Sequence, residues 1–192
     1  MILVGYDGSD DAQAAIDHVA ALMSGAEATV LTIWEPFLDV MLRSGAMAMG
    51  MTASTAPYDD DEKIDAANQQ TALRSATAGA ERATAAGLLA QPRIASGHGG
   101  ISEAILAVAA DVDAEVVVLG TRGLGGVKSF LLGSVSHAVI QHADRAVLVV
   151  PSPALVEQRH RGTHPADSAA GVRDSRETSP PSGLIPQPST IK

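Results

Sequence analysis

Residues 116–134 read VVVLGTRGLGGVKSFLLGS, and this stretch decides the predicted fold. The apolar run Val116–Leu119 ends at Gly120, and four more glycines follow before Ser134. We interpret the stretch as a buried strand that passes into a glycine-rich loop and then into a helix with Ser134 as its N-cap. Such a loop can turn several backbone N–H groups toward one point, and a helix N-terminus favours negative charge. The sequence therefore predicts a phosphate-binding site after this strand.

Two common phosphate-binding patterns do not match the stretch. The Walker pattern requires Lys and then Ser or Thr after the glycine at Gly125, where this chain has Gly126 and Val127. The dinucleotide-binding fingerprint, started at Gly123, requires a third glycine at the position of Lys128. Both motifs are therefore excluded.

A third spacing is present, with two residues between the first two glycines and nine before the next: Gly120, Gly123, Gly133 and then Ser134. This spacing resembles the nucleotide-binding motif of the universal stress protein family, in its ATP-binding branch. The resemblance extends to residues 2–9, ILVGYDGS, which look like the family's opening strand and loop, and to residues 146–151, AVLVVP. Three separated matches are more specific than one glycine pair, and together they cover roughly the first 150 residues.

Strand-like and helix-like patterns alternate over the same part of the chain. Residues 1–4 and 28–34 are apolar runs, and residues 12–23 have helical spacing with Ser9 or Asp10 as the N-cap. Alternating elements with nearly continuous apolar strands predict a parallel sheet that is covered by helices on both faces. The fold class is therefore α/β.

The resemblance implies an open five-stranded parallel sheet in the order 3-2-1-4-5, the Rossmann-like fold of the adenine nucleotide alpha hydrolases. In this order the carboxyl ends of the first and fourth strands flank a crevice, and we expect Asp7 and Gly120 to meet there. The third strand is expected around Arg93–Ala95, where Pro92 restricts it to a sheet edge or a strand start.

The domain is expected to span residues 1–151. Residues 37–57 show no sustained period and are predicted to form a flexible loop. Consecutive acidic residues at 59–62 favour the N-terminus of an alanine-rich helix rather than a metal site. Residues 152–192 are rich in Pro, Ser, Arg and Asp, and are predicted to be a disordered tail.

The composition argues against several kinds of binding surface and site. The formal net charge is −9, and the segment before Ser152 contains 18 acidic and 8 basic residues, which argues against a nucleic-acid-binding surface. The chain has no cysteine, so disulfides and thiolate sites are excluded. The N-terminus shows neither a signal peptide nor a membrane span, and we expect a cytoplasmic protein without membrane contact.

The resemblance implies that ATP is the ligand, with Mg²⁺ between its phosphate oxygens. Leu119 and Ile33 would flank the adenine, and Asp7 and Gly120 would hold the nucleoside. The expected binding residues are Gly5, Asp7, Ile33, Leu119, Gly120, Arg122, Gly123, Gly133, Ser134, Val135 and Ser136. Arg122 lies where a phosphate would need a cation, although an ordinary solvated loop charge explains it equally well.

The histidines do not support a catalytic or metal site. His98 lies in a glycine-rich turn, and the sequence places no carboxylate or nucleophile beside it. His137 and His142 are five residues apart, which does not align two ligands on one helix face.

Three functions remain open at this point. The first is an ATP-binding stress-response or signalling module with slow or no hydrolysis, because no residue resembles a base that positions water. The second is a scaffold of the same fold that binds no nucleotide. The third is an enzyme that transfers adenylate, which would require a further substrate domain. The apolar strand at residues 146–150 would lie at a sheet edge, and we expect it to pair with a second copy in a homodimer.

Overall fold

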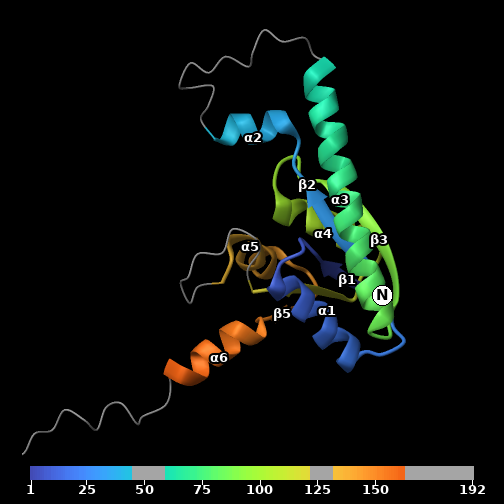
Figure 1. The fold of residues 1–192 in the computed structure, drawn as a ribbon, viewed down its shortest axis with the longest axis vertical. Coiled ribbons are helices and arrows are strands. Elements are labelled where there is room, and N and C mark those ends of the chain that lie inside the picture. The colour runs from blue at the N-terminus through green and yellow to red at the C-terminus, as the bar shows by residue number, and fades with distance from the viewer. Residues whose placement is uncertain (45–58, 122–131, 163–192) are drawn as a thin grey trace, which may run out of the picture.

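The computed structural model describes residues 1–44, 59–121 and 132–162. All strand pairs are parallel and form one five-stranded sheet in the order β3-β2-β1-β4-β5, which confirms the predicted α/β fold (Figure 1). The strands are β1 (Ile2–Gly5), β2 (Glu27–Trp34), β3 (Leu89–Ser96), β4 (Val116–Gly120) and β5 (Ala146–Val150). The helices are α1 (Asp10–Leu22), α2 (Phe37–Arg43), α3 (Asp59–Ala85), α4 (Ile101–Asp111), α5 (Ser134–His142) and α6 (Pro153–Gly162).

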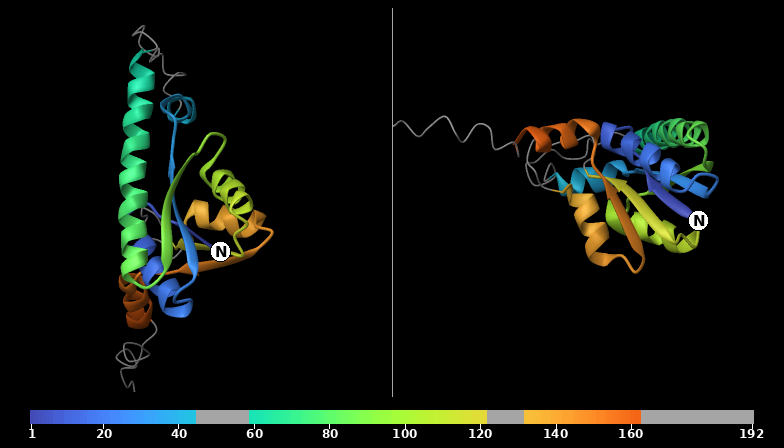
Figure 2. Two further views of the ribbon diagram at one scale, coloured as in Figure 1. Left: turned by 90° about the vertical axis from the view of Figure 1, so that its right-hand side faces the viewer. Right: turned by 90° about the horizontal axis from the view of Figure 1, so that it is seen from below.

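Side chains alternate between the two faces of the sheet and so build two separate cores. On one face Ile2 and Val4 pack with α1 and α3, in a cluster that includes Ile16 and Ala80. On the other face Leu3 packs with residues of α4 and α5. The two helical layers on opposite sides of the strands are visible in Figure 2. The strands are therefore buried on both faces, as parallel strands generally are.

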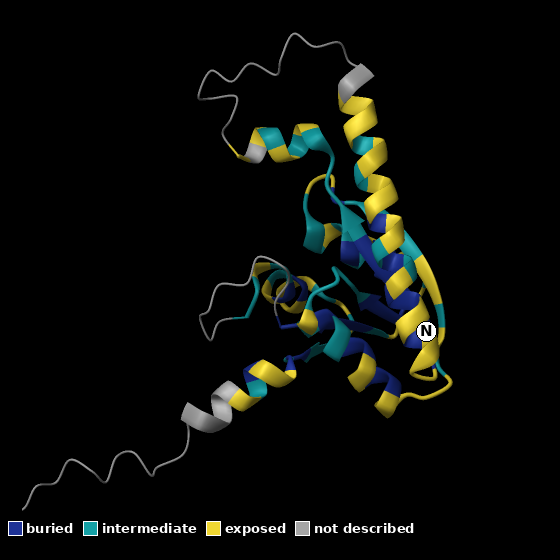
Figure 3. Cartoon of the chain, viewed as in Figure 1, coloured by how far each residue is buried: buried dark blue, intermediate teal, exposed yellow. Residues whose placement is uncertain are grey.

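Burial follows this layering (Figure 3). The central strands are mostly buried, whereas the outward faces of the helices are exposed. α3 is the longest helix among the described residues, with 27 residues, and one stripe of small side chains packs it onto β2 and β3. That stripe consists of Ala72, Ala76, Ala80 and Ala83. No helix in the described ranges is both long and apolar enough to cross a membrane.

The start of α1 confirms a local prediction. Ser9 is the N-cap, and its hydroxyl oxygen accepts a hydrogen bond of 3.2 Å from the N–H of Ala12. Asp10, the other predicted cap, is instead the first residue of the helix, where its negative charge interacts favourably with the helix dipole.

Two predicted boundaries are wrong, and a third prediction is confirmed in position but not in length. The predicted loop at 37–57 begins with helix α2, and its residues 45–58 lie outside the described residues. The predicted disordered tail begins with α6, because Leu155 is buried although the surrounding sequence is polar. The third strand lies at the sheet edge, as Pro92 predicted, but it extends over eight residues instead of the few around Arg93–Ala95.

Candidate nucleotide-binding site

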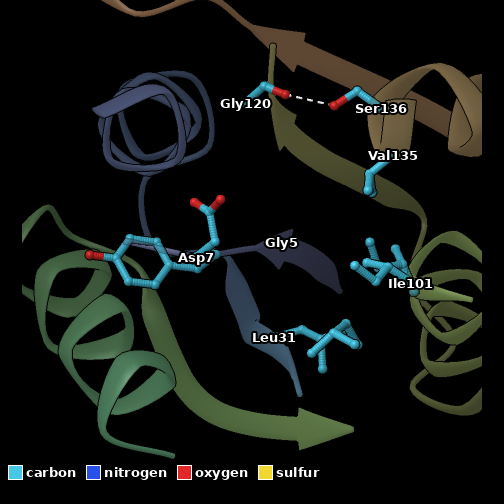
Figure 4. A pocket seen from close by; sticks show the side chains of 10 residues that line it. Gly5, Asp7, Leu31, Ile101, Gly120, Val135 and Ser136 are labelled. Atoms are coloured by element: carbon cyan, nitrogen blue, oxygen red, sulfur yellow. Dashed lines mark hydrogen bonds between the residues drawn. The ribbon is translucent and has the colours of Figure 1, made fainter. Parts of the chain in front are cut away.

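A pocket of about 170 Å³ lies at the carboxyl ends of β1 and β4 (Figure 4). At this point the strand order of the sheet reverses direction, which is where open α/β sheets bind ligands. The lining consists of Gly5, Tyr6, Asp7, Leu31, Ile33, Ile101, Ile105, Gly120, Val135 and Ser136. The wall is mostly apolar and carries a single carboxylate, that of Asp7. An apolar pocket with few polar groups is typical of a small-molecule site.

The loop after β1 places Asp7 at the pocket. Tyr6 is held on β2, because its N–H donates to the Leu31 carbonyl at 2.8 Å and its carbonyl accepts from the Thr32 hydroxyl at 2.7 Å. Asp7 Oδ1 accepts a hydrogen bond of 3.0 Å from the N–H of Ser9. The carboxylate is therefore fixed by a turn that also caps α1.

The ends of the glycine-rich loop are joined beside the pocket. The N–H of Gly133 donates to the carbonyl of Thr121 at 2.8 Å. One turn into α5, the buried hydroxyl of Ser136 donates to the carbonyl of Gly120, also at 2.8 Å. These bonds hold the N-terminus of α5 against the end of β4, so that the first N–H groups of that helix lie next to the pocket.

The structure brings together many of the residues predicted from the sequence. The pocket lining includes Gly5, Asp7, Ile33, Gly120, Val135 and Ser136. Gly133 and Ser134 lie at the start of α5, but Gly133 is the N-cap and Ser134 is the first helical residue, so the predicted cap is wrong by one position. Arg122 and Gly123 lie outside the described residues.

Leu119 does not line the pocket as the adenine prediction expected. Its side chain is 5% exposed and belongs to the core between the sheet and α4 and α5. Its Cδ2 atom approaches the backbone of Gly5 so closely that a Cβ atom there would lie 2.5 Å away. Leu119 therefore packs behind Gly5, which lines the pocket.

Sequence reasoning missed four lining residues: Tyr6, Leu31, Ile101 and Ile105. Three of them belong to patterns that the sequence shows. Leu31 precedes the predicted Ile33 by two residues in the same strand, so both side chains point to one face. Ile101 and Ile105 are four residues apart on α4 and share one helix face, but only the fold places that face over the pocket.

His98 has a carboxylate neighbour that the sequence did not reveal. Its Nδ1 lies 2.7 Å from Oδ2 of Asp39, on α2. The imidazole is 79% exposed and is not part of the pocket lining. The contact thus joins α2 to the turn before α4, outside the pocket.

Comparisons with known proteins agree with this architecture. The model of the universal stress protein family matches residues 1–151. A curated universal stress protein of Thermus aquaticus is 34% identical over 154 residues, which cover 78% of this chain and 96% of that protein.

Solved structures share the fold at low sequence identity. The hypothetical protein MJ0577 superposes with a TM-score of 0.61 at 22% identity, covering 78% of this chain and 94% of its own. An Arabidopsis thaliana family member, solved with AMP bound, has a TM-score of 0.54 at 16% identity and covers 86% of this chain and 97% of its own. The match over residues 1–151, together with the Thermus relative, shows that this chain belongs to the universal stress protein family.

Proposed function

We propose that the protein binds an adenine nucleotide, ATP with Mg²⁺, and acts in the cytoplasm as a stress-response or signalling module with little or no hydrolysis. The observation that carries the proposal is the pocket at the carboxyl ends of β1 and β4, which joins an apolar wall to the N-terminus of α5. The wall suits a base, and the helix N-terminus suits a phosphate.

The volume of the pocket supports a division of the ligand between two regions. At about 170 Å³ the pocket is smaller than the roughly 300 Å³ at the lower end of complete ligand sites. It can enclose the base and part of the sugar, while the phosphates would extend toward the glycine-rich motif. Ile33 and Val135 would contact the base, Asp7 and Gly120 the nucleoside, and Gly133, Ser134 and Ser136 the phosphates; Gly5 would form part of the floor.

The residues at the motif fit a phosphate group. Thr121 Oγ1, directly after Gly120, is buried and has no hydrogen-bond partner among the described residues. Arg122 and Gly123 follow it and remain proposed phosphate contacts from the sequence. In this proposal Mg²⁺ is held by phosphate oxygens, and it supplies charge neutralisation at the phosphates. The AMP bound to the Arabidopsis family member supports an adenine nucleotide as the ligand class.

Isothermal titration with ATP, ADP, AMP and GTP tests the proposal. We expect adenine nucleotides to bind and Ile101→Trp to abolish the heat signal, because the larger ring fills the pocket that Ile101 lines. Ile140→Trp, on the exposed side of α5, is the matched control and is expected to bind normally. Gly123→Val is expected to abolish binding as well. No affinity for any nucleotide up to millimolar concentration would refute the proposal and favour the scaffold function.

We also propose that the protein is a homodimer paired through β5. This strand lies at the sheet edge and its five residues are all apolar, a combination that soluble proteins usually cover. The carbonyl of Val150 accepts a hydrogen bond of 2.9 Å from Thr121, so it faces β4. Since the direction of backbone groups alternates along a strand, Val149 presents its N–H and C=O to the outer edge.

Sedimentation at micromolar concentration tests the dimer. Val149→Pro removes only an outward N–H and is expected to give monomers. Val149→Thr keeps the N–H and the branched shape, and should remain dimeric. A monomeric unsubstituted protein would contradict pairing through β5.

A further inference from the structure

A chain of hydrogen bonds runs from α3 to the loop that carries Asp7. Arg82 on α3 donates to both carboxylate oxygens of Asp17, from Nε at 2.9 Å and from Nη2 at 2.5 Å. Its Nη1 donates to Oε1 of Gln13, on α1, at 3.3 Å. Gln13 in turn donates from Nε2 to the carbonyl oxygen of Gly8 at 3.1 Å. The side chain of Gln13, on α1, therefore connects Arg82 of α3 with Gly8, the residue after Asp7.

The chemistry of the two partners defines the orientation of the Gln13 amide. A guanidinium group can only donate hydrogen bonds, and a backbone carbonyl can only accept them. The amide oxygen must therefore face Arg82, and the amide nitrogen must face Gly8. The hydrogen bond to Asp17 raises the pKa of Arg82 above its ordinary value, and the guanidinium is a permanent cation that can only donate.

Gly8 is where the loop after β1 departs from extended geometry. Its φ is +85°, in the left-handed region that favours glycine. On the strand side, the bonds of Tyr6 to Leu31 and Thr32 fix the loop to β2. On the helix side, Gln13 is the side chain that holds the carbonyl of Gly8. Asp7 lies between these two anchors, and its carboxylate accepts the N–H of Ser9 within the same turn.

We propose that Gln13 is a positioning residue for the nucleotide site, which fixes the Gly8 carbonyl and thereby the direction of the Asp7 carboxylate. The inference rests on the proposed nucleotide binding. Gln13 itself is not among the residues that line the pocket, so its effect on affinity passes through the loop. Arg82 acts one step further away, because it orients the amide of Gln13.

Substitutions at Gln13 separate this positioning role from a role in stability. Gln13→Ala removes the bond to Gly8 but raises helix propensity inside α1, which offsets the lost contacts in the folded protein. Gln13→Glu keeps an acceptor for Arg82, loses the donor to Gly8 and places a negative charge beside that carbonyl. Gln141→Ala, at an exposed glutamine of α5, is the matched control.

The experiment measures the Kd for AMP by isothermal titration and the melting temperature without ligand. For both Gln13 variants we expect a Kd roughly three- to tenfold higher, the effect of one hydrogen bond, with a nearly unchanged melting temperature. Gln141→Ala should change neither quantity. Arg145→Ala, far from the loop, should lower the melting temperature and leave the Kd unchanged.

The outcomes separate this inference from the proposed function. An unsubstituted protein that does not bind AMP refutes both. An unsubstituted protein that binds AMP, with Gln13 variants of unchanged Kd, refutes the positioning role alone. If the Gln13 variants lose stability in proportion to affinity, Gln13 is only structural and the inference is also wrong.

Discussion

The hydroxyl group of Ser136, on α5, donates a hydrogen bond of 2.8 Å to the carbonyl oxygen of Gly120, the last residue of β4. Both residues are buried, and both line the pocket. This bond ties the start of α5 to the strand that precedes the glycine-rich motif. If the donor is removed, the buried carbonyl is left without a hydrogen bond, because water cannot reach it. The resulting loss of folding free energy is larger than the net contribution of the bond itself.

Ser136→Ala is therefore expected to lower the free energy of unfolding by about 1–3 kcal/mol. Urea denaturation followed by circular dichroism measures this change. Ser134→Ala is the matched control, because Ser134 is exposed and donates no buried bond to another described residue. Its change should stay within about 0.5 kcal/mol. Equal stability of the two variants would show that the bond at Gly120 is not needed for folding.

Gly120→Ala is expected to destabilise the fold by a different cause. A Cβ atom at Gly120 would lie 2.7 Å from the backbone carbon of Asp11 and 2.9 Å from the backbone nitrogen of Ala12. The start of α1 would have to move, which costs about 1–3 kcal/mol in a packed interior. Gly5→Ala should cost less, since its Cβ would meet the flexible end of the Leu119 side chain. Urea midpoints in the reverse order would contradict this explanation.

Arg145 connects the start of β5 to the end of α4. Its Nη1 donates to the carbonyls of Ala109 and Ala114, each at 2.8 Å. These carbonyls lie near the C-terminal end of α4 and just beyond it, where a cation also interacts favourably with the helix dipole. Arg145→Ala should lower the free energy of unfolding, because the carbonyls of Ala109 and Ala114 both lose a charged donor. Arg74→Ala is the control, because among the described residues the Arg74 guanidinium bonds to Thr71 of its own helix, and it should change this free energy by less than about 0.5 kcal/mol.

Asp144 gives a prediction for pH. The hydrogen bond from Arg145 lowers the pKa of the Asp144 carboxyl below its ordinary value. A carboxyl whose pKa is lower in the folded state stabilises the fold above its unfolded pKa and loses that effect as pH falls through the folded value. The stability difference between the unsubstituted protein and Asp144→Asn should therefore be present above about pH 4 and vanish at lower pH. Thermal melts at several pH values measure it, and a difference that grows toward acid would contradict the assignment.

Local patterns explain why much of the fold was predictable. The cap at Ser9 and the apolar run of β5 depend on neighbours within a few residues, and both were placed correctly. The predictions failed at residues 37–43, where the lack of a sustained period indicated a loop, and at residues 153–162, where the composition indicated a disordered tail. In the second of these segments, the buried side chain of Leu155 stabilises a helix that its own sequence favours only weakly.

The sequence by itself determined the parallel α/β sheet, because the periodicity of strands and helices depends on residues that are neighbours in the chain. The resemblance of its glycine spacing to a known family added the strand order in which the segments around Asp7 and Gly120 meet. Only the tertiary structure decided which side chains close the pocket and how its loop is held. Ile101 reaches the site from α4, and Arg82 reaches Gln13 across 69 residues of chain. Such contacts depend on how the helices pack on the sheet, and a local pattern of residues does not encode which distant segments come together.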